Sequence, residues 1–112
     1  MDKFSVQTET KGSIAVITVG GRIDSETAPA FDDELTTVVG RSSKLVLNLK
    51  GVDYMSSAGI RAIVKASQTV EKNGGMVRLA SVPDLVNSVL YTVGLNQKLG
   101  SYASVDEAVA SF

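Results

Sequence analysis

Segments with the apolar pattern of strands alternate with segments of helical period from residue 13 onward, and this alternation restricts the possible folds more than any other feature. Strands are predicted at residues 13–19, 44–49 and 76–80, each followed by apolar residues at helical spacing. Such alternation is typical of α/β domains in which right-handed crossovers join parallel strands. A weaker strand at residues 4–8 adds an N-terminal antiparallel hairpin, so we predict a mixed, mostly parallel sheet.

About four helices are expected to pack on this sheet. The first ends at Gly40, with acidic residues near its start and Arg41 at its end, in the order that the helix dipole favours. The others are predicted at residues 57–73, 83–94 and 105–110. Ser104 is the expected N-cap of the last helix, and Leu85 is expected on the apolar face of the third. A final short strand is predicted near residues 99–102.

The size and charge of the chain limit its organisation and its partners. With 112 residues there is room for one core, so residues 1–112 are predicted to be a single domain. The formal net charge is −1, which leaves no basic field for a nucleic acid or an anionic membrane. The N-terminal sequence lacks the apolar stretch of a signal peptide, and no apolar run is long enough to span a bilayer. We therefore expect a cytoplasmic protein with no nucleic-acid or membrane partner.

The chain contains no cysteine and no histidine, and both absences narrow its chemistry. Without Cys there is no disulfide framework, no thiolate nucleophile and no Cys-bound metal. Without His, a serine nucleophile has no imidazole base, and zinc has no imidazole ligand. An enzyme would depend on carboxylates, Lys, Tyr or a carboxylate-held cation. We predict a protein that is not an enzyme and has no cofactor or metal.

Two predicted loops lie at the carboxyl ends of neighbouring strands, where open α/β sheets bind their ligands. One loop begins at Gly20-Gly21, and the other covers residues 50–57. Because parallel strands end at the same edge of a sheet, the polar residues of these loops should be neighbours. They are Asp24, Asp53, Ser56 and Ser57.

The stretch VDYMSSAGIRAIV places two serines where a helix should begin. A serine at the N-cap accepts a hydrogen bond from a first-turn N–H, which stabilises a helix by about 1 kcal/mol, and local evidence favours this interpretation. A helix N-terminus also favours an anion, so a serine there is well placed to carry a phosphate or to lie beside one. Bound nucleotide has little support, because neither a GxxxxGK[ST] loop nor a dinucleotide fingerprint is present.

Several short motifs follow one another in a recognisable order. They are GRID at residues 21–24, TAP at 27–29, LNL at 47–49, DYMSSAGIR at 53–61, GG at 74–75, and Pro83 followed by VL at 89–90 and GL at 94–95. Singly they are weak signals. In this order and spacing the chain resembles the STAS domain family, and within it the bacterial anti-sigma-factor antagonists. The resemblance covers most of the chain and implies a single STAS-type α/β domain.

The resemblance implies a small non-enzymatic switch. In the family, the unmodified antagonist binds an anti-sigma factor that is itself a serine kinase, which frees the sigma factor. The kinase phosphorylates a serine at the start of this helix, and a serine phosphatase resets it. Aligned on the motif, the phospho-acceptor is Ser57, with Ser56 as a competitor where many members carry Asp. The predicted partner-binding residues are Asp24, Thr27, Ser56, Ser57, Gly59 and Arg61.

Several of these residues also have a purely structural interpretation. Asp24 either caps the first helix or belongs to the surface that the kinase contacts. Asp53 is expected to form a turn, and Tyr54 and Met55 to pack under the loop. For Arg61, a solvated helical face is favoured over an ion pair with a partner. Gly59 would let the helix start close to the sheet.

Two rival functions remain open. A domain with this fold could instead be a STAS subunit of a lipid-transport or sensory complex. A small phosphate-binding or nucleotide-binding enzyme that uses Asp24, Asp53 and the serines is a weaker alternative, because the chain has no His or Cys.

Overall fold

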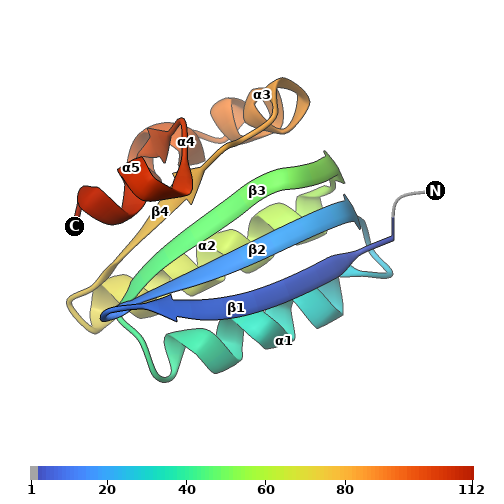
Figure 1. The fold of residues 1–112 in the computed structure, drawn as a ribbon. Helices are drawn as coiled ribbons and strands as arrows, with labels where there is room; N and C mark the ends of the chain where they lie inside the picture. The colour runs from blue at the N-terminus through green and yellow to red at the C-terminus, as the bar shows by residue number, and fades with distance from the viewer. Residues whose placement is uncertain (1–2) are drawn as a thin grey trace.

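The computed structural model describes residues 3–112, which form a five-stranded sheet with helices on both faces (Figure 1). The strands follow one another across the sheet in chain order. They are β1 (Ser5–Lys11), β2 (Ile14–Ile23), β3 (Lys44–Met55), β4 (Met76–Ala80) and β5 (Ser101–Tyr102). The helices are α1 (Ala28–Val39), α2 (Ser57–Lys72), α3 (Asp84–Thr92), α4 (Leu95–Leu99) and α5 (Val105–Ala110).

The pairing of the strands confirms the predicted topology. β1 pairs antiparallel with β2 through a turn at Gly12, whose φ of +65° is a conformation that favours glycine. The pairs β2–β3, β3–β4 and β4–β5 are all parallel. The prediction of a mixed, mostly parallel sheet with an N-terminal hairpin is therefore correct, and the described residues contain five helices where about four were expected.

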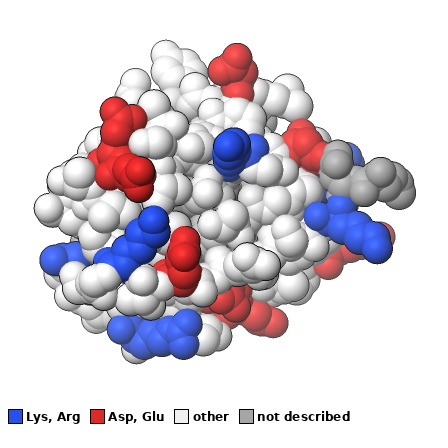
Figure 2. Space-filling view, in the orientation of Figure 1, with Lys and Arg blue, Asp and Glu red and all other residues white. Residues whose placement is uncertain are grey.

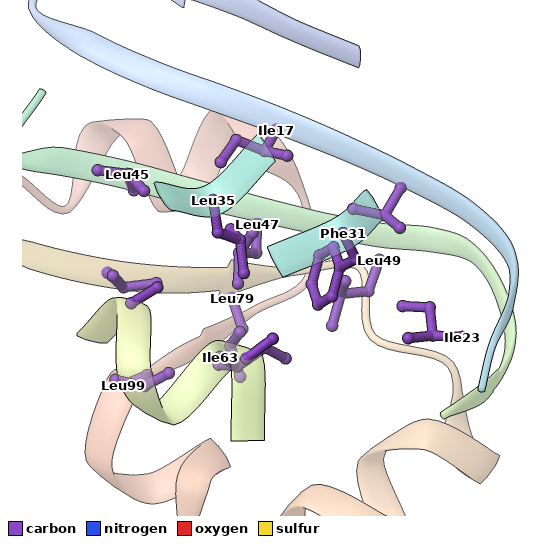
Figure 3. Close-up of a cluster of buried hydrophobic side chains, with 14 of the residues drawn as sticks. Ile17, Ile23, Phe31, Leu35, Leu45, Leu47, Leu49, Ile63, Leu79 and Leu99 are labelled. Atoms are coloured by element: carbon purple, nitrogen blue, oxygen red, sulfur yellow. The ribbon is translucent and has the colours of Figure 1, made fainter. Parts of the chain in front are cut away.

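Alternating side chains divide the core between the two faces of the sheet. On one face, Ile17 of β2 and Leu47 of β3 are fully buried with Phe31 of α1 (Figure 3). On the other face, Val46 packs in a smaller cluster with Ala108 of α5. Burial of one such large side chain contributes about 1.5–3 kcal/mol. The larger cluster holds α1 and α2 on the sheet and so determines where α2 begins.

The surface of the molecule carries charges of both signs. Figure 2 shows acidic and basic side chains interspersed over the face that is turned toward the viewer. This distribution fits the formal net charge of −1. Within residues 3–112, no helix combines the length and the apolar character needed to cross a membrane.

Strands β2 and β3 extend further than predicted. β2 continues through Gly20-Gly21 to Ile23, and β3 continues through the predicted loop at residues 50–57 as far as Met55. The two extensions pair with each other, so Ile23 lies opposite Met55. Asp53 is consequently an exposed strand residue, and the prediction that it forms a turn is wrong.

The glycines mark irregular strand pairing, and not the end of a strand. The register between β2 and β3 shifts on both sides of Gly20-Gly21. The backbones approach closely there, since a Cβ on Gly51 would lie 3.2 Å from Gly20 Cα. Gly21 has φ +84°, and a Cβ there would lie 2.2 Å from the carbonyl oxygen of Lys3. The contact at Gly21 excludes any side chain, and the contact at Gly51 is tight for one. With glycine at these positions, the pairing of β2 with β3 continues past the point where local patterns predict a break.

The charge pattern predicted for α1 is wrong. The helix begins at Ala28 and ends at Val39, and it has no acidic residue in its first turn and no basic residue in its last. Within the helix the acidic side chains begin at Asp32, one turn later, while Asp24 and Glu26 precede the N-cap residue and Arg41 lies beyond the helix. The dipole therefore receives little help from these charges, and α1 is stabilised chiefly by its buried apolar face.

The region after α3 also differs from prediction. Gly94, with φ +76°, separates α3 from a short helix, α4. α4 includes Leu99, so the strand predicted at residues 99–102 is limited to Ser101–Tyr102. On α3, only Val86 and Leu90, four residues apart, are buried. Leu85 is 65% exposed, because the helix contacts the core along a single narrow stripe. The prediction of Leu85 as a buried residue is wrong.

Candidate functional site

The start of α2 is held against the carboxyl ends of β2 and β3. Ser56 is the N-cap residue, with an extended backbone. Its N–H donates to the carbonyl of Ile23 (2.8 Å), and its own carbonyl accepts from the N–H of Ile60 (3.1 Å). A Cβ on Gly59 would lie 2.7 Å from Ile23 Cγ2 and 3.0 Å from Met55 Cγ. Gly59 therefore lets the helix start directly on the sheet.

The two serines at this helix start differ in exposure. Ser56 Oγ is buried and has no hydrogen-bond partner within residues 3–112. Ser57, the first residue of α2, is exposed. The side chain of the N-cap residue makes no capping hydrogen bond, so the favoured interpretation of the serines as a cap is wrong. Because the first turn of α2 also has no acidic residue, no carboxylate of that turn compensates the positive end of the helix dipole.

Asp24 and Thr27 order the loop that leads into α1. Asp24 Oδ1 accepts from the backbone N–H groups of Glu26 (2.9 Å) and Thr27 (3.1 Å). Thr27 Oγ1 accepts from the N–H of Asp24 (2.9 Å) and donates to the carbonyl of Arg22 (2.8 Å). Asp24 thus closes the turn before α1, while the N-cap of the helix itself is Thr27.

These contacts stabilise the ionised form of Asp24. The backbone N–H of Thr27 is the largest cause that holds the pKa of Asp24 below its ordinary value. The N–H of Glu26 and the guanidinium of Arg22 also lower this pKa, whereas desolvation opposes them. At neutral pH Asp24 is therefore ionised and paired with Arg22.

Arg22 and Tyr54 form a further exposed pair at this edge. They lie opposite each other on β2 and β3, and the guanidinium carbon of Arg22 is 4.1 Å from the ring centroid of Tyr54. Arg22 Nε is also 3.1 Å from Asp24 Oδ2. Tyr54 is 39% exposed, so the prediction that it packs under the loop is wrong, whereas Met55 is buried as predicted. Sequence patterns missed this pair because it depends on the shifted register; the Arg-x-Asp spacing is the one local signal.

Most of the predicted site residues meet at one edge of the sheet. Ile23 of β2 pairs with Met55 of β3, and Asp24 and Ser56 directly follow these two residues. The two segments therefore leave the sheet side by side. Arg61 is exposed one turn further along α2. Within residues 3–112, no group of three or more acidic side chains is arranged to hold a metal ion.

A groove of about 490 Å³ adjoins this edge, between the N-terminal halves of α1 and α2. Lys65 Nζ crosses from α2 to Asp32 Oδ2 of α1 at 3.2 Å. Ser57 is not one of the lining residues, but it immediately precedes Ala58, which is. We call this groove the α1–α2 groove; its lining includes Ala28, Pro29, Asp32, Ala58, Arg61 and Lys65.

Comparison with known proteins identifies relatives of this architecture. The STAS domain family model matches residues 5–108. The anti-sigma-F factor antagonist RsfB of Mycobacterium tuberculosis is 25% identical over 111 residues, which cover 96% of this chain and 88% of the relative. The structure of an anti-sigma factor antagonist from Mycobacterium paratuberculosis superposes with a TM-score of 0.89 at 23% identity, covering 97% of this chain and 93% of that one. The Bacillus protein SpoIIAA in its phosphorylated form gives a TM-score of 0.78 at 19% identity, covering 96% and 98%.

Proposed function

The chain belongs to the STAS domain family, as its motifs predicted, and on this premise we propose that it acts as an anti-sigma-factor antagonist. Its unphosphorylated form binds an anti-sigma factor that is a serine kinase, and the sigma factor is released. Phosphorylation of Ser57 switches this binding off, and a serine phosphatase restores it. The observation that carries the proposal is that Ser57, the first residue of α2, is exposed at a helix start without a side-chain cap.

The names of the relatives support this function. RsfB of Mycobacterium tuberculosis is named an anti-sigma-F factor antagonist, and a Bacillus subtilis relative is named an anti-sigma-B factor antagonist. Both names are those of regulatory proteins. We place the activity in the cytoplasm, where sigma factors work.

Exposure favours Ser57 over Ser56 as the phospho-acceptor. A kinase must bring the γ-phosphate of ATP into line with the hydroxyl oxygen, and the buried Oγ of Ser56 offers no such approach. At Ser57, the Oγ attacks the γ-phosphorus, the bond to ADP breaks, and the hydroxyl proton passes to a base of the kinase. The residue difference from many family members, Ser56 in place of Asp, therefore leaves one accessible acceptor.

The phosphate can abolish binding while the domain stays folded. It adds about −1.5 to −2 charges and three acceptor oxygens. The positive end of the α2 dipole accommodates this charge. At the partner interface, the same group adds bulk and repels acidic partner side chains.

The remaining predicted partner-binding residues support the surface in different ways. Asp24 and Thr27 order the loop beside Ser57 through four hydrogen bonds between side chain and backbone. Gly59 fixes the distance between α2 and the sheet. Arg61 supplies an exposed cation on the same helix. We propose that the partner contacts this edge.

Affinity purification with three tagged variants tests the proposal. Ser57→Ala should retain an anti-sigma factor kinase, and Ser57→Asp should lose it. Ser104→Ala is the matched control, because it removes a serine at another helix start and should behave like the wild type. After incubation of the wild type with the recovered kinase and ATP, mass spectrometry should find the phosphate on Ser57.

Other outcomes separate the alternatives. Phosphate on Ser56 would contradict the residue assignment but keep the switch. Modification of neither serine would refute the switch. Recovery of a lipid-transport or sensory complex with all variants would favour the rival STAS function.

A further inference from the structure

The α1–α2 groove combines an apolar floor with a charged rim. The floor consists of the small side chains of Ala28, Pro29 and Ala58, which leave room for an aliphatic side chain of another protein. The rim carries Arg61 and Lys65 from α2. Such a floor and rim are suited to a peptide segment that is both aliphatic and charged.

The charges on the rim are not balanced within the groove. Lys65 pairs with Asp32 Oδ2 at 3.2 Å, so these two charges largely cancel. Asp32 Oδ1 is buried and has no hydrogen-bond partner among residues 3–112. Arg61 is exposed and forms no ion pair within those residues. The groove therefore offers an exposed guanidinium without an ion pair, which complements a segment that carries a carboxylate.

Arg61 is also the cation best placed to meet a phosphate on Ser57. Residues four apart on a helix lie on one face, with Cβ atoms about 5–6 Å apart. Long helical side chains lean toward the helix N-terminus, so Arg61 leans toward Ser57. A guanidinium binds phosphate through paired, charge-assisted hydrogen bonds. Lys65, two turns from Ser57, is already engaged with Asp32.

We propose that Arg61 communicates the phosphorylation state of Ser57 to the α1–α2 groove. When Ser57 is unmodified, Arg61 binds a carboxylate on an aliphatic segment of the anti-sigma partner that docks in the groove. When Ser57 is phosphorylated, the guanidinium closes onto the phosphate, and the groove loses the cation that held the partner. This inference rests on the proposed function and adds the docking site and the means by which the phosphate acts there.

The contact between Arg61 and the phosphate can be tested without any partner. Phosphoserine is incorporated at position 57 by genetic code expansion, and the phosphate is titrated by ³¹P NMR in three proteins: the parent, Arg61→Gln and Lys72→Gln. The Arg61 cation should lower the second pKa of the phosphate, so Arg61→Gln should raise it. Lys72→Gln removes the same charge from the last turn of α2 and should leave it unchanged. Equal pKa values in the parent and Arg61→Gln overturn the proposal.

The docking role is tested by calorimetry with the anti-sigma factor recovered with Ser57→Ala. In unphosphorylated protein, Arg61→Gln should weaken binding about tenfold, and Lys72→Gln should not. Arg61→Lys, which keeps the charge, should recover part of the loss. Phosphate on Ser57 should weaken binding by a smaller factor in Arg61→Gln than in the parent, because the cation that it withdraws is already missing.

The outcomes distinguish this inference from the function on which it rests. If phosphate weakens binding equally in the parent and in Arg61→Gln, the proposed role of Arg61 is wrong while the Ser57 switch stands. If phosphate has no effect in the parent, the proposed function itself fails. If Arg61→Gln binds as tightly as the parent, the partner does not dock through this groove. Thermal melts of all variants verify that each is folded.

Discussion

Helices α2 and α5 both begin after a serine in extended conformation, but only one of the two serine side chains caps its helix. Ser104 Oγ accepts from the N–H of Glu107 at 3.1 Å and so caps α5, as predicted. Ser56 occupies the same position before α2, but its hydroxyl is buried and makes no capping bond. The same residue type at the same position is a cap in one helix and not in the other.

The residues that follow each serine also differ. The first turn of α5 contains Asp106 and Glu107, which provide negative charge for its own dipole. The first turn of α2 contains Ala58 and Gly59 and no acid. The dipole of α5 is therefore compensated by its own acidic residues, whereas a phosphate added at the start of α2 can supply the negative charge that this helix lacks.

The largest effect is expected on partner binding, when α2 is given an acidic first turn like that of α5. Ser57→Asp places a carboxylate in the first turn, where the dipole should accept it with unchanged or slightly higher stability. Binding to the anti-sigma factor should nevertheless fall about a hundredfold, because the charge lies at the partner surface. Calorimetry and thermal melts measure the two properties separately. Wild-type affinity for this variant would contradict the surface assigned to Ser57.

Gly59 and Glu107 are each the third residue of their helix, and substitution by valine should reduce stability more at Gly59 than at Glu107. Gly59→Val forces a side chain against Ile23 and Met55 and should cost about 1–3 kcal/mol of unfolding free energy. Glu107 is exposed and a valine there meets no clash, so Glu107→Val should cost only the dipole contribution of the lost carboxylate, about 0.3–1 kcal/mol. Urea unfolding of both variants measures the difference. Equal losses would show that the close approach of α2 to the sheet is unimportant.

Alanine at the two N-cap serines tests the comparison directly. Ser104→Ala should cost about 1 kcal/mol, because a capping bond is lost. Ser56→Ala should change stability by less than about 0.5 kcal/mol in either direction, because its buried hydroxyl has no partner to lose. Urea unfolding of the pair gives both values. A cost at Ser56 as large as that at Ser104 would restore the capping interpretation for α2.

The smallest expected effect is on the pH dependence of stability, through Asp24 in the turn before α1. The pKa of Asp24 is lowered in the folded state, so its contribution to stability is present above the ordinary value of 3.8 and is lost as pH falls through the folded-state pKa. Asp24→Asn should therefore reduce stability at neutral pH and flatten the decline in acid. The cost of Ser104→Ala should not vary with pH, because a hydroxyl does not titrate in this range. Parallel pH curves for Asp24→Asn and the wild type would contradict this.

Local patterns in the sequence sufficed wherever neighbours along the chain determine the conformation. The β-branched run of β2, the apolar run of β3 and the helical spacing in α2 were enough to predict a mixed α/β sheet. The position of Ser104 directly before the helical segment predicted its cap, because both partners of that bond lie within one turn.

What the sequence could not determine are the features that depend on residues distant along the chain. Pairing of Ile23 with Met55 carries both strands past their glycines, and this pairing makes Asp53 a strand residue and exposes Tyr54 against Arg22. Ser56, which a backbone hydrogen bond ties to Ile23, has a buried Oγ, whereas Ser57 is exposed. By itself the sequence determined that two hydroxyls stand at a helix start. Only the tertiary structure decided which of them is accessible, because burial depends on the neighbouring strand and not on the motif.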